Sequence, residues 1–325
     1  MLTRGNALSW LVTPPTASGV TPLSSIWGVV ICVLLYFATI RVLQRWVAAR
    51  GRPFDLNWFV IVHNSLLSIL SAVLFFALVS EISTVVHEAG VWSLFCDPSG
   101  RHVGGALYFI YFLNYIAKYV ELIDTCLLAL RGKPIPFLHA YHHAATLVLC
   151  WSQLWAQSCI QWLPIVINLL VHVVMYAYYT LHAMGFSIWW KKYLTLLQIT
   201  QFIVALIGCV GAFSTRLLSL NFPDSLPLEQ FKCHGTHGGA WVGIGIIASY
   251  LYLFVVLFRE KYDDSSSAAQ RKKKHASMRK IRPVLVEDES SAAQSRELAE
   301  KAAEKVNQKA ANGHANGNGN GRHLD

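Results

Sequence analysis

The chain has 325 residues, of which 54% are hydrophobic and only 14% charged, and its mean hydropathy is +0.41. A soluble domain carries about 25% charged residues, so this composition excludes an ordinary soluble protein and indicates a chain that lies largely in lipid. The net charge of +9 does not indicate nucleic acid as a partner, because 14 of the 27 lysines and arginines fall between Arg259 and Asp325.

Seven apolar runs are each about long enough to cross a bilayer as a helix. The sequence therefore predicts an all-α integral membrane protein with seven transmembrane helices. The N-terminus has neither the basic start nor the small-residue cleavage site of a signal peptide, so the first run is interpreted as a span. The predicted spans cover residues of about 24–44, 57–80, 104–126, 136–156, 161–184, 193–214 and 239–258.

The distribution of basic residues between the predicted spans indicates the orientation of the chain. With the N-terminus outside the cytoplasm, eight lysines and arginines fall on the cytoplasmic side and four on the other, which agrees with the positive-inside rule. The eight are Arg41, Arg45, Arg50, Arg52, Arg131, Lys133, Lys191 and Lys192, and the four are Arg4, Arg101, Arg216 and Lys232.

This orientation divides the chain into three regions. Residues 1–23 form a lumenal N-terminal segment, residues 24–258 form the seven-helix membrane domain, and residues 259–325 form a cytoplasmic tail. The tail contains the basic run 271–274 and an Asn- and Gly-rich stretch at 312–321. Such a composition cannot bury a core, and we predict a basic, disordered segment without a catalytic role.

Three histidines stand together in an otherwise apolar segment, Phe137-Leu-His-Ala-Tyr-His-His143. His139, His142 and His143 are costly to remove from water, and ionisable groups inside membrane segments usually line a cavity, a pathway or an active site. This cluster is the strongest indication that the chain performs chemistry in a membrane.

Polar residues also recur on one face of other predicted spans, by the 100° spacing of a helix. Charge neutralisation within one helix and hydrogen bonds between helices would each explain one such face. Several polar faces in one bundle must meet one another, because lipid does not accept them, and we predict an enclosed polar chamber. Its residues include Lys118, Glu121, Asp124 and Thr125 in one span, Asn168, His172, Tyr176 and Tyr179 in another, Thr195, Gln198 and Gln201 in a third, and the pair His63-Asn64.

Four segments, in this order, resemble the signature boxes of the ELO fatty acid elongases. They are Lys118-Tyr-Val-Glu-Leu-Ile-Asp-Thr125, Phe137-Leu-His-Ala-Tyr-His-His143, Asn168-Leu-Leu-Val-His-Val-Val-Met-Tyr-Ala-Tyr-Tyr179 and Thr195-Leu-Leu-Gln-Ile-Thr-Gln201. The resemblance covers residues of about 55–260. The stretch from His142 to Trp151, together with Trp189-Trp190-Lys191, is most similar to the fungal branch.

The resemblance implies a condensing enzyme of the endoplasmic reticulum, a very-long-chain 3-oxoacyl-CoA synthase. In the reaction, a long-chain acyl-CoA and malonyl-CoA give a 3-oxoacyl-CoA two carbons longer, CO2 and CoA. The resemblance also implies a barrel-like bundle around an acyl tunnel, no metal and no cofactor beyond these substrates. The implied partners are the ketoacyl reductase, dehydratase and enoyl reductase of the elongation cycle, and a second copy of the chain.

Within this family, Pro134 stands where members that act on polyunsaturated chains often have Gln. That difference and the fungal likeness favour saturated or monounsaturated substrates, as precursors of very-long-chain fatty acids and sphingolipids.

Two cysteines, Cys96 and Cys233, fall in predicted non-cytoplasmic loops, where an oxidising lumen permits a disulfide. The residues alone are equally compatible with two unrelated thiols, while the resemblance implies that the two are bonded. The other five cysteines are predicted to be packing residues.

The chemistry assigns expected roles to the chamber residues. A neutral imidazole is a competent acyl acceptor, so His142 is the predicted nucleophile. We expect His172 to position malonyl-CoA or to support the charge that develops, with His139 and His143 orienting these groups. The predicted substrate-binding residues are Lys118, Glu121, Asp124, Asn168, Tyr176, Tyr179, Gln198 and Gln201.

Two other classes of protein remain open alternatives. Membrane di-iron desaturases and hydroxylases also carry HxxHH boxes, but they use about eight histidines in three boxes as iron ligands. This chain has one such box, and His172 and His182 stand outside it. A seven-helix receptor or channel would explain the spans, but not a Lys/Glu/Asp face beside a triple-histidine face.

Overall fold

A computed structural model describes residues 23, 25–97, 100, 102, 104–221 and 235–262. Within them all regular structure is helical, which confirms the all-α prediction. The helices are α2 (Ile26–Arg50), α3 (Asn57–Ala89), η1 (Val91–Leu94), α4 (Gly105–Leu130), α5 (Phe137–Ala156), η3 (Cys159–Gln161), α6 (Trp162–Ala183), α7 (Lys191–Asn221) and α8 (His237–Tyr262).

The chain divides into two units, Met1–Phe258 and Arg259–Asp325. The helices from α2 to α7, and α8 as far as Phe258, belong to the first unit. The predicted N-terminal segment up to residue 22, and the predicted tail from residue 263 onward, lie outside the described residues.

A long helix occupies each of the seven positions predicted from the sequence. Within the part of the chain that the structure describes, α2, α3, α4, α6, α7 and α8 are long and apolar enough to cross a membrane. The 20-residue helix α5 is not among these six, because three histidines and a glutamine lower its hydropathy. The chain is thus a multi-pass membrane protein, whereas the count of seven spans and the orientation stay predictions.

The histidine segment is helical because of the residues on either side of it. Pro136 precedes α5 with its φ of −63°, and its carbonyl oxygen accepts hydrogen bonds from the backbone N–H of His139 at 3.1 Å and of Ala140 at 3.3 Å. A proline suits this position because it has no N–H to leave unpaired. Gln157 ends the helix in the left-handed conformation, with φ of 51°. The three histidines consequently lie in the first two turns of α5.

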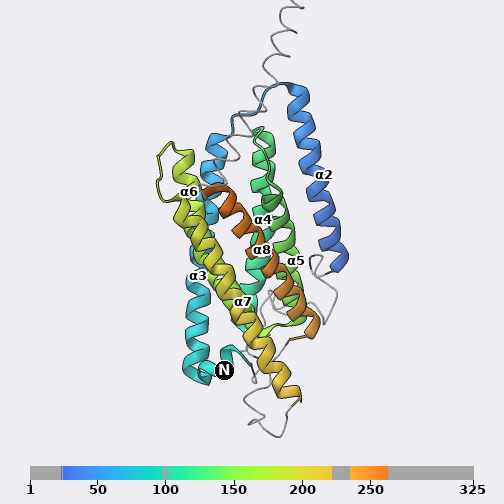
Figure 1. Cartoon of the computed structure of the whole chain (residues 1–325), viewed down its shortest axis with the longest axis vertical. Coiled ribbons are helices and arrows are strands. Elements are labelled where there is room, and N and C mark those ends of the chain that lie inside the picture. The colour runs from blue at the N-terminus through green and yellow to red at the C-terminus, as the bar shows by residue number, and fades with distance from the viewer. Residues whose placement is uncertain are drawn as a thin grey trace, which may run out of the picture. The chain divides into compact units, whose positions relative to one another are not determined.

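Six helices contact one another in a closed ring. Helix α3 packs against α6 and α4, α6 packs against α7, and α4 packs against α5. Phe202 of α7 packs against Tyr250 of α8, and Tyr141 of α5 is hydrogen-bonded to Ser249 of α8 at 2.7 Å, which completes the ring. Helix α2 lies outside it against α4 and α5 (Figure 1).

The exposed side chains of these helices differ in chemistry from the buried ones. Large apolar residues such as Trp27, Trp58 and Phe76 are about 70% exposed, and only lipid would cover them. Helix α4 contributes the fully buried Tyr108, Tyr111 and Tyr115, and the buried Lys118 and Glu121. Charged groups at such depth need partners.

Candidate active site

The three histidines of α5 point in two directions. His139 and His143 are four residues apart and share a helix face, with ring centroids 4.6 Å apart and ring planes inclined at 62° to each other. The His142 ring instead lies 4.8 Å from the Tyr250 ring of α8, and neither of its nitrogens is hydrogen-bonded to a described residue. His142 lines a cavity inside the bundle, whereas His139 and His143 do not. His142 is therefore the member of the cluster that faces this space.

A first polar network connects α4 with α6. Lys118 Nζ donates hydrogen bonds to Glu121 Oε1 at 2.8 Å and to Asn168 Oδ1 at 3.0 Å. His172 Nδ1 lies 3.3 Å from the same Glu121 oxygen, within ion-pair distance but outside hydrogen-bond geometry. Lys118, Glu121 and His172 are all less than 5% exposed. The network brings together a cation, a carboxylate and an imidazole that the sequence had placed on two separate helices.

A second network is centred on Asp124. Its Oδ1 lies 2.7 Å from His63 Nε2 of α3, and its Oδ2 accepts a hydrogen bond from the Tyr176 hydroxyl of α6 at 2.8 Å. His143 Nε2 is 3.9 Å from Oδ2. One carboxylate thus connects four helices. Charge-assisted hydrogen bonds are about twice as strong as neutral ones, so Asp124 holds α3 and α6 against α4.

Helix α8 supplies a brace for the histidine helix. The Tyr250 hydroxyl donates to the backbone carbonyl of His142 at 3.2 Å and is 2.9 Å from Thr146 Oγ1. Tyr250 is only 2% exposed. Because its ring also packs against that of His142, a single residue holds both the backbone and the imidazole of this position.

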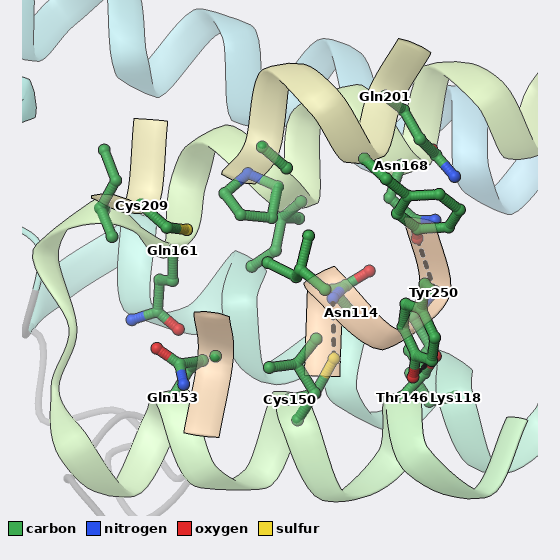
Figure 2. A pocket seen from close by; sticks show the side chains of 18 of the residues that line it. Asn114, Lys118, Thr146, Cys150, Gln153, Gln161, Asn168, Gln201, Cys209 and Tyr250 are labelled. Carbon is green, nitrogen blue, oxygen red and sulfur yellow. Dashed lines mark hydrogen bonds between the residues drawn. The ribbon is translucent and has the colours of Figure 1, made fainter. Parts of the chain in front are cut away.

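The cavity that His142 lines lies between α4, α5, η3, α6, α7 and α8, and most of the surface that lines it is apolar. Figure 2 shows Lys118, Thr146, Asn168, Gln201 and Tyr250 near one end, and Gln153, Gln161 and Cys209 near the other. Apolar residues such as Leu149, Ile165 and Ile247 line the walls between them. The chamber therefore has apolar walls and polar side chains near both ends, and His142 is among the residues that line it.

The predicted site residues do not all join this chamber. Lys118, His142, Asn168 and Gln201 line it directly, and Glu121 and His172 reach it through the first network. Gln198 donates to Met175 Sδ at 3.4 Å. Tyr179 is 42% exposed and contacts the ring of Tyr178.

Several residues that line the chamber were not among the predicted site residues, namely Asn114, Thr146, Gln153, Gln161 and Tyr250. His63, which pairs with Asp124, was not among them either, although the polar pair His63-Asn64 interrupts an apolar run in the sequence. Tyr250 carried no such signal, since an aromatic residue in an apolar helix is usual.

The described cysteines comprise one disulfide-bonded residue and five free thiols, of which Cys150 and Cys209 line the chamber. Cys96 is disulfide-bonded and fully buried. Its predicted partner, Cys233, lies outside the described residues, so the pairing stays a prediction. Cys32, Cys126, Cys150, Cys159 and Cys209 are free thiols. Among the described residues, no group of three or more His, Cys, Asp or Glu side chains is arranged to hold a metal ion.

These features define a helical membrane protein with an enclosed histidine and carboxylate site at one end of an apolar chamber. The model of the ELO (GNS1/SUR4) family matches residues 21–274, and the chain belongs to this family. It is 37% identical over 244 residues to "Putative fatty acid elongase 1" of Schizosaccharomyces pombe, which covers 75% of this chain and 72% of that protein. It is 33% identical to "Fatty acid elongase A" of Dictyostelium discoideum, over 78% of this chain and 89% of that one.

Proposed function

We propose that this protein is a fatty acid elongase that condenses a long-chain acyl-CoA with malonyl-CoA. The observation that carries the proposal is the position of His142, whose unpaired imidazole faces an apolar chamber next to the buried Lys118–Glu121–His172 network. Such a chamber suits an acyl chain, and membership of the ELO family supports this reaction over iron-dependent oxidation or a receptor function.

In the first step, His142 takes the acyl group. One ring nitrogen attacks the thioester carbonyl, the carbon–sulfur bond breaks, and the CoA thiolate leaves with the proton from the other ring nitrogen. The product is an acyl-imidazole, which a second nucleophile attacks readily. Tyr250 holds the His142 backbone and ring during this step, and therefore limits the positions that the imidazole can adopt.

In the second step, malonyl-CoA loses CO2. The bond between its carboxyl group and the adjacent carbon breaks, and the electron pair remains as an enolate. The enolate carbon attacks the acyl carbonyl, the carbon–nitrogen bond breaks, and the imidazole of His142 recovers a proton. His172 and Lys118 are the groups that would position the malonyl thioester or stabilise the enolate charge. Their contact with Glu121 sets their orientation.

We also propose seven spans with the N-terminus lumenal and the C-terminus cytoplasmic, in the membrane of the endoplasmic reticulum. The eight-to-four division of basic residues supports this orientation. The contacts of α5 within the ring support its place as a span, despite its polar residues. The remaining enzymes of the elongation cycle would receive the 3-oxoacyl-CoA product from the cytoplasmic side.

Very-long saturated or monounsaturated chains, used for sphingolipids, are the proposed substrates. Pro134 and the similarity to the fungal branch support this preference. The chain would act without a metal or a resident cofactor, and as a homodimer.

Condensation by membranes that contain the protein tests the reaction. Acyl-CoA primers of increasing length are incubated with radiolabelled malonyl-CoA, and label in longer acyl products is measured for the wild type and for His142→Ala. We expect incorporation by the wild type and none by the variant, together with loss of the acylated enzyme by mass spectrometry. Acylation of His142→Ala at the wild-type level would exclude this nucleophile.

His182→Ala provides the matched control. This histidine lies one helix away on α6, is exposed, and stacks on Tyr178 at 6.0 Å. The same substitution there should leave incorporation unchanged. If no primer is elongated by the wild type, the elongase proposal itself is wrong.

A further inference from the structure

A band of amide side chains crosses the chamber at the end remote from the histidines. Gln153 of α5 and Gln161 of η3 face each other across it, and Asn114 of α4 lies between them and the catalytic end (Figure 2). The walls on either side include Leu154, Ile160 and other apolar residues. An acyl chain needs only apolar walls, so these amides have no part in the reaction proposed above.

The amides are buried with hydrogen-bonding capacity left over. Gln161 is 3% exposed, and neither its Nε2 nor its Oε1 has a hydrogen-bond partner among the residues that the structure describes. Asn114 is 2% exposed; its Nδ2 donates weakly to Cys150 Sγ at 3.7 Å, and its Oδ1 is unpaired. Gln153 uses its Nε2 on the Gly239 carbonyl at 2.9 Å. Buried polar atoms are nearly always paired, so an unpaired donor and acceptor on one side chain indicate an absent partner.

The partner must reach these amides from within the chamber. When an acyl chain fills that space it displaces water, and its methylene groups cannot replace the lost hydrogen bonds. A chain without a polar substituent would therefore leave the Gln161 amide unpaired, which weakens its binding relative to a chain that carries a hydroxyl. A hydroxyl group both donates and accepts, and this matches the two unpaired atoms of Gln161.

We propose that the chamber contains a subsite for a hydroxyl group on the acyl chain, formed by Gln161, Gln153 and Asn114. The inference rests on the elongase function proposed above and specifies its substrate class. The distance of the hydroxyl from the thioester follows from α5, because His142 and Gln153 are eleven residues apart on one helix. At a rise of about 1.5 Å per residue the two are about 16 Å apart, which places the hydroxyl far along the chain.

Two hydroxylated primers of equal length and equal polarity test the subsite. One carries its hydroxyl about 16 Å from the thioester in the extended chain, and the other carries it on the carbon beside the thioester. We expect the wild type to prefer the first by at least about tenfold in kcat/KM, the effect of one well-placed buried hydrogen bond. A saturated primer of the same length is measured in parallel.

Gln161→Met removes the amide and keeps the length of the side chain, and should bring the preference close to unity. Leu154→Met introduces the same residue into the same wall and should retain the full preference. Asn114→Leu is a second amide-removing variant, and a reduced preference is expected there too. Elongation of the saturated primer by each variant shows that it has folded.

Equal kcat/KM for the two hydroxylated primers in the wild type, with the saturated primer elongated normally, would overturn the subsite and leave the elongase function intact. The amides would then be paired by water. A preference that survives in both Gln161→Met and Asn114→Leu would overturn it as well. If no primer at all is elongated, the proposed function fails and the subsite fails with it.

Discussion

Lys118 Nζ donates a hydrogen bond to Glu121 Oε1 at 2.8 Å across one turn of α4, with the two side chains only 3% and 4% exposed. Removing one member of a buried pair leaves an uncompensated charge, at a cost of about 3–5 kcal/mol, whereas replacing both by apolar residues is often nearly neutral. The pair therefore matters to stability mainly when it is broken on one side only.

We expect Lys118→Met and Glu121→Leu each to lower the thermal stability of the detergent-solubilised protein, and the double variant to be more stable than either. Thermal unfolding followed by size-exclusion chromatography measures the order. All three variants should lack condensation activity, because the double variant restores packing but not the charges near the chamber. A double variant whose losses simply add would show that the two charges are not coupled in the folded protein.

The separate positions of His142 and His172 predict separable defects. We expect His172→Gln to accumulate the acylated enzyme, while CO2 release from malonyl-CoA falls by about 10²–10⁴-fold, the usual contribution of a group that supports charge in a transition state. Intact-protein mass spectrometry detects the acylated species, and labelled CO2 reports the second step. His182→Gln, on the same helix but exposed, should do neither. Loss of the acylated species in His172→Gln would assign this histidine to the first step instead.

Two glycines of α8 predict where the chamber limits the chain. A Cβ atom at Gly243 would lie 3.2 Å from Gln153 Nε2, whereas one at Gly245 would meet nothing within 4 Å. We expect Gly243→Phe to shorten the longest product while short primers are still elongated, because the new ring occupies the remote half of the chamber. Gly245→Phe makes the same change on a surface with open space and should not alter the products. Chromatography of the acyl chains gives both distributions, and an unchanged longest product in Gly243→Phe would show that acyl chains do not enter that half.

The helices were predictable because apolar length and helical spacing are local properties. The described helices agree with the predicted runs, and the bounds differ where polar residues continue a helix past its apolar part. Helix α3 reaches Ala89, although hydropathy alone ended the span at residue 80. Backbone hydrogen bonds extend through Glu81 and His87 regardless of their polarity.

The grouping of polar faces was also predictable, but not the partners within it. Glu121 and Asp124 are three residues apart, and so belong to one face. In the structure Glu121 pairs with Lys118 and lies beside His172, while Asp124 pairs with His63 and Tyr176. Which groups meet depends on the axial offset between α3, α4 and α6, and a single sequence contains no measure of that offset.

The remote amides show the same limit. Gln153 and Gln161 lie at the end of one predicted span and the start of the next, where polar residues normally face water or lipid head groups. In the structure they line the chamber instead, because η3 and α8 form part of its wall. The environment of these two glutamines therefore depends on tertiary packing, which their local sequence does not indicate.

The brace from Tyr250 to His142 has a consequence for the synthesis of the protein. Helix α8 is the last of the described helices to leave the ribosome, yet it supplies the hydroxyl that holds the His142 backbone and part of the chamber wall. Until α8 docks, the chamber is open on one side and the His142 imidazole lacks its contact with the Tyr250 ring. A nascent chain with all earlier helices inserted therefore still lacks one wall of the chamber and the hydrogen bond to the His142 backbone, and both are completed when α8 docks.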